Sequence, residues 1–254
     1  MPPCASLGAL ARPLLLLLLL GGCAGTADPG GYAPPQRQLP DLYDRPAQVR
    51  DPLYVPDPLE TTNRRLYRFN ARLDEYVLVP VVDAYVAVTP GFVRKRVSSF
   101  FLNLGEVNTF LNSVLQLRAS KAGPTLVRFA VNSTLGLLGL FDVASEMGIR
   151  RESEDFGQTL GYWGVEPGAY LVLPALGPSN VRDAVGRVLD WASFSYIVPD
   201  RIDGHTSYKV ARYGLEPIDT RYRVPFRYYD TGSPFEYELV RYALTEARAL
   251  EIRR

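Results

Sequence analysis

The sequence predicts a predominantly α-helical protein. Apolar residues recur at spacings of three and four after residue 57, no stretch sustains the strict alternation of a half-buried strand, and proline or glycine separates the periodic stretches. The chain has 254 residues, of which 47% are hydrophobic. This length suffices for one large domain with its own core, although two domains stay open.

The first 22 residues have the three parts of a secretory signal peptide. Arg12 supplies positive charge, Leu14 to Leu20 form the apolar run, and small residues follow. The run is too short to cross a bilayer, which takes roughly 20 apolar residues in a helix, so we expect it to be removed. Leu20-Gly21-Gly22-Cys23 resembles the bacterial lipobox, which predicts acylation of Cys23. The alternative is an ordinary signal peptide with a chance cysteine.

Cysteine usage and charge limit the remaining function classes. Cys4 leaves with the signal peptide, so Cys23 has no disulfide partner, and acylation would protect its thiol in an oxidising compartment. In the general sorting pattern Ala24 directs a lipoprotein outward, which predicts the periplasmic face of the outer membrane. The chain carries 28 basic and 27 acidic residues with no basic block, so we do not expect nucleic-acid binding.

The sequence divides into three predicted segments. Residues 1–22 are the lipoprotein signal peptide, residues 23–56 are an acylated tether rich in proline, glycine, aspartate and glutamine, and residues 57–254 form the helical domain. Asp57-Pro58-Leu59-Glu60 predicts a helix start, with Asp57 as the N-cap. An apolar stripe continues through Leu66, Phe69, Leu73 and Val77 until Pro80 interrupts it, and a plain core stripe is the alternative.

Two further helices and a long uncharged stretch follow. Thr89-Pro90 predicts the start of a helix whose apolar face extends towards Leu115, and Gly123-Pro124 ends this pattern before the next helix. Residues 129–141 carry no charge and are too short to cross a bilayer. We expect a short buried, re-entrant or interfacial element there, although a soluble core helix would have the same sequence pattern.

The last third begins with an irregular segment over residues 154–178, rich in glycine, proline and aromatic residues. Pro178-Ser179 predicts the cap of a helix in which Val181, Val185 and Leu189 share one face and Arg182, Asp183 and Arg187 lie away from it. Two more helices are expected, at about residues 208–222 and 234–252.

No catalytic or metal site emerges from the sequence. His205 is the single histidine and sits in a polar turn, and neither Ser133 nor Ser179 lies in a Gly-x-Ser-x-Gly motif. One histidine and one acylated cysteine do not make a zinc site. We therefore expect a protein without enzymatic activity, metal or cofactor, and we keep a lipid-modifying hydrolase and a porin-associated structural lipoprotein as alternatives.

Over about residues 57–190, the chain resembles the VacJ/MlaA family of outer-membrane lipoproteins. Thr61-Thr62 and Glu106-Val107 depart from the family pattern. The matching residues are Asp57-Pro58-Leu59-Glu60, Asn63-Arg64, Phe69-Asn70, Leu73-Asp74, Pro80-Val81, Phe100-Phe101-Leu102-Asn103-Leu104, Arg128-Phe129, Asn132-Ser133-Thr134, Gly139-Leu140-Phe141-Asp142, Asp155-Phe156-Gly157-Gln158-Thr159-Leu160-Gly161, Tyr170-Leu171-Val172-Leu173-Pro174, Gly177-Pro178-Ser179 and Arg182-Asp183.

The resemblance implies a ring-like helical lipoprotein embedded in the periplasmic leaflet of the outer membrane, with a central amphipathic channel and porin trimers beside it. It implies that phospholipids that stray into the outer leaflet pass through the channel to a soluble periplasmic lipid carrier, which maintains lipid asymmetry. An inner-membrane ATP-driven complex would take the lipid onward.

Polar residues within apolar stretches are the candidates for a channel lining or gate. A phospholipid needs a polar wall for its headgroup and an apolar path for its tails. Asn132, Ser133 and Thr134 meet this description, with Gly136 and Gly139 permitting bends, and a capped helix break is the alternative. Phe69 and Asn70 are further candidates, because the resemblance links that family segment to leaky lipid flow.

Overall fold

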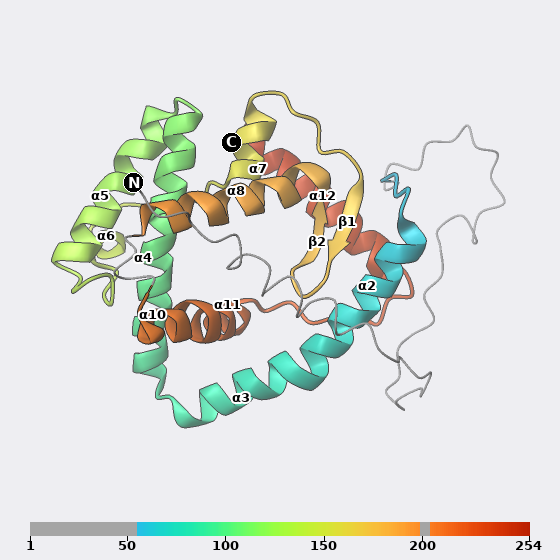
Figure 1. The fold of residues 1–254 in the computed structure, drawn as a ribbon, viewed down its shortest axis with the longest axis horizontal. Coiled ribbons are helices and arrows are strands. Elements are labelled where there is room, and N and C mark those ends of the chain that lie inside the picture. Colours follow the sequence, from blue (N-terminus) through green and yellow to red (C-terminus); the bar gives the residue numbers. More distant parts are fainter. Residues whose placement is uncertain (1–54, 199–203) are drawn as a thin grey trace, which may run out of the picture. The chain divides into compact units, whose positions relative to one another are not determined.

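The computed structural model describes residues 55–198 and 204–254 (Figure 1). Helices dominate this part of the chain, with one pair of short strands, so the predominantly α class is confirmed. The signal peptide (1–22), Cys23 and the tether up to residue 54 lie outside the described residues.

The first helical segment is longer than predicted, because Pro80 does not end it. Helix α2 (Glu60–Leu73) passes through a π-helical turn (Asp74–Leu78) into α3 (Val79–Val88). The N–H of Val79 donates to Asp74 O, five residues back, so the wider turn directly precedes Pro80. A proline is tolerated at the start of a helical segment, where a missing N–H costs little.

The predicted N-cap at Asp57 is also displaced. Helix α2 begins at Glu60, and Leu59 occupies its N-cap position without a side-chain hydrogen bond. The Asp57 carboxylate instead accepts from the N–H of Leu59 (3.1 Å) and from Asn63 Nδ2 (2.8 Å). Asp57 therefore stabilises the turn before the helix rather than its first N–H groups.

Helices α4 (Gly91–Leu115) and α5 (Ala119–Thr134) pack along each other. Pro90, rather than Thr89, occupies the N-cap position of α4. Gly123-Pro124 does not separate two elements as predicted, because Pro124 lies inside α5. After α5 the chain turns over residues 135–141 and enters the short helix α6 (Val143–Glu146), which Asp142 caps by accepting from the N–H of Ser145 (3.1 Å).

The segment 154–178 is not irregular, as the sequence suggested. It contains α7 (Phe156–Tyr162) and the first strand of an antiparallel hairpin, β1 (Tyr170–Leu173) and β2 (Gly177–Asn180). Tyr170 pairs with Asn180, and Leu173 with Gly177. Ala175 in the turn between them and Gly177, the first residue of β2, both have positive φ. Four-residue strands are too short for alternation to reveal them in sequence.

The last helices confirm the predicted order. They are α8 (Val181–Ile197), α10 (Thr206–Val210), a π-helical turn (Ala211–Leu215), α11 (Glu216–Arg223) and α12 (Glu236–Arg253). The cap of α8 is Asn180 rather than Ser179, because Asn180 Oδ1 accepts from the N–H of Asp183 (2.8 Å). Strand β1 contacts α2 and β2 contacts α12, so the hairpin joins both helices (Figure 1).

Candidate functional site

The interior of the described domain is unusually polar. In the described part of the chain, twenty-three buried residues are polar or charged and nine are apolar. Large apolar side chains lie outside instead: Val188 is 63% exposed and Leu138 is 73% exposed. A soluble protein normally buries its apolar side chains and leaves charges in water. Exposed apolar surface of this kind is typical of a contact with a membrane, a ligand or another protein.

Two predicted apolar stripes carry residues that are exposed, whereas polar residues of the same helical segments are buried. On α2 and the π-helical turn that follows it, Phe69 and Val77 are about half exposed, while Asn63, Asn70 and Asp74 are buried. On α8 the predicted sharing of faces holds, but the face that carries Val181, Val185 and Leu189 is exposed, whereas Arg182 and Asp183 are buried. The alternative of a plain core stripe therefore fails for Phe69 and Val77, whereas Leu66 packs against the buried core and Leu73 is partly buried.

Asn63 and Asn70, which we call the asparagine clasp, hold the outer edge of β1. Asn63 Nδ2 donates to Tyr170 O (3.0 Å) and its Oδ1 accepts from the N–H of Val172 (2.9 Å). Asn70 does the same two turns later, with Leu173 O (2.9 Å) and the N–H of Ala175 (2.8 Å). These side chains replace a neighbouring strand, because the backbone groups of a strand edge need partners when buried.

A second polar network surrounds Arg128 on α5. Its guanidinium donates to Glu106 Oε1 (3.0 Å) and to Asp142 Oδ1 (3.0 Å). Asn132 donates to the same Asp142 oxygen (3.0 Å) and accepts from the N–H of Ala144 (2.9 Å). The Arg128 network therefore fixes α4, α5 and α6 to one another.

The pKa values of the two carboxyl groups in this network are shifted in opposite directions. Burial raises the pKa of Glu106, although Arg128 and Arg151 oppose it. Partial burial also raises the pKa of Asp142, but hydrogen bonds from Ser145 and Asn132 outweigh burial, and the net pKa is lowered. Glu106 Oε2 has no hydrogen-bond partner among the described residues. The pKa shifts of the two carboxyl groups that pair with Arg128 are therefore opposite in direction.

Residues 135–141, which we call the leucine turn, reverse the chain after α5. Leu137, Leu138 and Gly139 have φ values of 52°, 59° and 90°. Glycine is required where the backbone is close: a Cβ at Gly139 would lie 2.6 Å from Asn103 Cβ, and one at Gly136 would lie 2.2 Å from Phe141 O. The turn therefore packs its glycines inward, while its leucines are exposed.

The structure distributes the predicted lining and gate residues between two places. Asn70 belongs to the asparagine clasp and Asn132 to the Arg128 network. Ser133 accepts from Asn103 Nδ2 (3.1 Å), whereas the exposed Thr134 donates to Ala130 O (2.7 Å) within its own helix. Gly136 and Gly139 lie in the leucine turn, and Phe69 is exposed on α2. All of these residues except Phe69 make hydrogen bonds or close packing contacts, and the part of each in a channel stays a prediction.

Sequence reasoning missed Asn63 and Glu106. Asn63 lies seven residues before Asn70, which places both side chains on the same face of the helix, two turns apart. This spacing is the sequence signal that could have identified Asn63. Glu106 occupies the buried face of α4, which also carries Thr109 and Asn112. A polar row at helical spacing normally indicates the solvent side, so nothing in the sequence marked it as internal.

A third buried polar group, the arginine–aspartate knot, joins α7, α8 and α12. Arg248 donates to Asp183 Oδ2 (2.8 Å) and with both Nη atoms to Asp155 (2.8 Å each). Arg182 donates to Asp183 Oδ1 (3.0 Å). Burial raises the pKa of Asp183, but the two guanidinium groups outweigh burial and the net pKa is lowered. The knot is therefore an ionised, mutually neutralised cluster.

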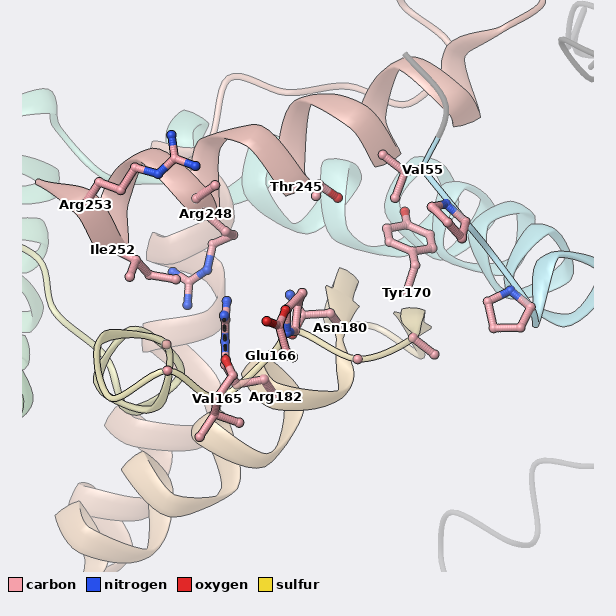
Figure 2. A pocket seen from close by; sticks show the side chains of 18 residues that line it. Val55, Val165, Glu166, Tyr170, Asn180, Arg182, Thr245, Arg248, Ile252 and Arg253 are labelled. Carbon is pink, nitrogen blue, oxygen red and sulfur yellow. Dashed lines mark hydrogen bonds between the residues drawn. The ribbon is translucent and has the colours of Figure 1, made fainter. Parts of the chain in front are cut away.

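Next to this knot lies a cavity of about 670 Å³ (Figure 2). One wall is α12, with Thr245, Ala249 and Ile252, and the other is the segment from Gly161 to Tyr170. Figure 2 shows Arg182 and Arg248 on one side of the cavity and Tyr170 on the other, near Val55. Most lining residues are apolar or glycine, which suits an apolar ligand.

His205 is exposed and sits at the N-cap of α10. No described helix combines the length and apolarity that a membrane crossing requires. Among the described residues, no three histidine, cysteine, aspartate or glutamate side chains are grouped as they would be around a metal ion.

Comparisons with known proteins agree with this arrangement. The family model described as MlaA lipoprotein matches residues 55–251. A protein of Rickettsia felis is 37% identical over 202 residues, 79% of each chain. The "Intermembrane phospholipid transport system lipoprotein MlaA" of Escherichia coli is 37% identical over 169 residues, 65% of each chain, and that of Haemophilus influenzae is 32% identical over 169 residues, 65% of this chain and 66% of the other.

Among solved structures, one described as "Structural basis for maintenance of bacterial outer membrane lipid asymmetry" is similar over 78% of this chain and 100% of that chain. Its TM-score is 0.65 and its sequence identity 31%. The family model alone covers more than half of the sequence. The chain therefore belongs to the MlaA lipoprotein family.

Proposed function

We propose that the protein is an outer-membrane lipoprotein that removes mislocalised phospholipids from the outer leaflet and passes them to a soluble periplasmic lipid carrier. This activity maintains the lipid asymmetry of the outer membrane. It needs no catalysis, metal or cofactor. The observation that carries the proposal is family membership over residues 55–251, together with relatives named for intermembrane phospholipid transport.

The inverted polarity of the domain supports this function physically. Polar groups inside and apolar side chains outside suit a body that lies in hydrocarbon and offers lipid headgroups a polar path. An apolar outer surface would also let the body lie within one leaflet without crossing the bilayer. In this proposal the domain encloses an amphipathic channel and contacts porin trimers, and Cys23 anchors it to the periplasmic face.

The gate of this channel is proposed at the leucine turn and its supports. Asn132 and Ser133 hold the start of the turn, Gly136 and Gly139 let it approach its neighbours, and its exposed leucines would contact lipid. Phe69 and Asn70 on α2 form a second candidate gate, next to the hairpin. Thr134 is the weakest candidate, because its hydroxyl is already bonded within α5.

The proposal is tested with radiolabelled phospholipid. The purified acylated protein is placed in vesicles that contain the labelled lipid, and a soluble periplasmic lipid carrier is added. We expect intact phospholipid on the carrier. Released fatty acid would instead identify a lipid-modifying hydrolase, and absence of both products would leave a porin-associated structural lipoprotein.

A further inference from the structure

The cavity between α12 and the α7–β1 segment has the composition of a site for an acyl chain. Its volume of about 670 Å³ lies within the range of roughly 300–1,000 Å³ that small-molecule sites occupy. Val165, Pro167 and Ala169 line it from the segment, and Ala249 and Ile252 from α12. None of these side chains offers a charge or a hydrogen bond, so a hydrocarbon chain would lose nothing on entering.

Three glycines lie in the wall formed by the segment from Gly161 to Tyr170. Gly161, Gly164 and Gly168 all line the cavity. A Cβ at Gly161 would lie 2.5 Å from Ile252 Cδ1, and Gly164 and Gly168 have φ values of 88° and 69°, which favour glycine. The segment therefore packs closely on α12 at Gly161, and none of its three glycines adds a side chain to the cavity.

The charges at the cavity divide into a neutralised set and a free pair. Arg182 and Arg248 also line the cavity, but both form ion pairs with Asp183, and Arg248 forms a second ion pair with Asp155. Arg253 on α12 and Glu166 on the opposite segment line the cavity too, are exposed, and form no ion pair with another described residue. Within the described part of the chain, one cation and one anion that form no ion pair thus line the same, mostly apolar cavity.

We propose that this cavity is a phospholipid site distinct from the channel, which holds one acyl chain of a zwitterionic phospholipid. The headgroup phosphate pairs with Arg253 and the ammonium group with Glu166, because the two free side chains carry the complementary charges. The inference rests on the proposed function, which supplies phospholipid as cargo, and it adds a residence site on α12 that a lipid occupies outside the channel.

The first test is photo-cross-linking. The acylated full-length protein is reconstituted in vesicles with phosphatidylethanolamine that carries a diazirine in one acyl chain, and cross-linked peptides are mapped by mass spectrometry. We expect label on both walls, in residues 161–170 and in α12. Ala249→Phe fills the cavity, and overpacking of this kind should reduce that label roughly tenfold. Ala247→Phe is the matched control, because Ala247 is exposed on the same helix and does not line the cavity.

The second test separates the headgroup contacts without filling the cavity. Arg253→Gln should weaken cross-linking of both phosphatidylethanolamine and phosphatidylglycerol by about two- to fivefold and leave diacylglycerol unchanged, as expected for an exposed ion pair. Glu166→Gln should weaken the cross-linking of phosphatidylethanolamine only. Arg254→Gln and Glu246→Gln are exposed controls outside the lining. Both key substitutions lie on the surface, so misfolding does not account for a loss of label.

Clear outcomes overturn the proposal. Equal labelling of Ala249→Phe and Ala247→Phe refutes the site, as does unchanged headgroup preference in Arg253→Gln and Glu166→Gln. So does label confined to other elements. Transfer to the carrier is measured in parallel: loss of transfer with the cavity label intact would refute the proposed function and leave the site standing.

Discussion

At the scale of single residues, asparagine does what a neighbouring strand would do elsewhere. The amide side chain has both a donor and an acceptor, so Asn63 and Asn70 each satisfy one C=O and one N–H on the β1 side of the hairpin. Few other side chains offer both groups at one end. The polar residue at each position is therefore required by the backbone it faces.

Asn70→Ala should lower the free energy of unfolding by about 1–3 kcal/mol for each backbone group left unpaired, because Leu173 O and the N–H of Ala175 would lose their partner. Thermal and denaturant unfolding in detergent, followed by circular dichroism, measures the change. Asn108→Ala is the control, since Asn108 Oδ1 has no hydrogen-bond partner among the described residues. Equal losses in the two variants would contradict a specific role of the clasp.

At the scale of elements, the leucine turn combines an unfavourable backbone with an exposed apolar surface. Leucine in the left-handed region costs roughly 1–2 kcal/mol, yet Leu137 and Leu138 both adopt it. The Arg128 network and the close contacts of Gly136 and Gly139 hold the turn in place. Strain of this kind, fixed by its surroundings, is consistent with the gate proposed for this segment.

Leu138→Asn should stabilise the protein by about 1 kcal/mol relative to Leu135→Asn, because asparagine tolerates positive φ better than leucine. Leu135 is the matched control: it is also exposed, at 67%, but has a φ of −74°. Unfolding in detergent measures stability, and sensitivity of cells to detergent plus chelator measures outer-leaflet phospholipid. If the turn is a gate, Leu138→Asn should also change that sensitivity. Identical stability of the two variants would argue against strain at Leu138.

At the scale of the whole molecule, two independent features would hold the protein on a membrane. One is the acylation proposed at Cys23, which lies outside the described residues, and the other is the apolar outer surface of the domain. Burial of apolar surface contributes roughly 25 cal/mol per Å², so exposed helix faces such as that of α8 add affinity beyond the acyl chains.

Cys23→Ala should abolish incorporation of palmitate, yet the protein should still require detergent for extraction, because the domain keeps its apolar surface. Metabolic palmitate labelling and extraction at high salt or in detergent measure the two effects. Ala24→Asp serves as the comparison: it should keep the label and move the protein to the inner membrane in a sucrose gradient. Palmitate in the Cys23→Ala protein would refute the lipobox assignment, and release by salt alone would refute membrane contact by the domain.

Patterns in the amino-acid sequence were enough to predict the helical class, the order of most helices from residue 57 onward, and the family resemblance. Periodicity also showed correctly that Val181, Val185 and Leu189 share a face. Periodicity reports which residues lie together along one helix, and this geometry is local. It therefore needed no knowledge of what surrounds the helix.

Which face of each helix is buried became clear only from the folded arrangement. The polar faces of α2 and α8 turn inward, where Asn63, Asn70 and Asp183 find partners contributed by β1, α12 and the turn before α2. Those partners lie up to 109 residues away in the chain, so no local pattern indicates them. The hairpin escaped detection because its strands have four residues each and its edge is completed by side chains of α2. Burial depends on the surrounding medium and on distant contacts, and a sequence pattern specifies neither.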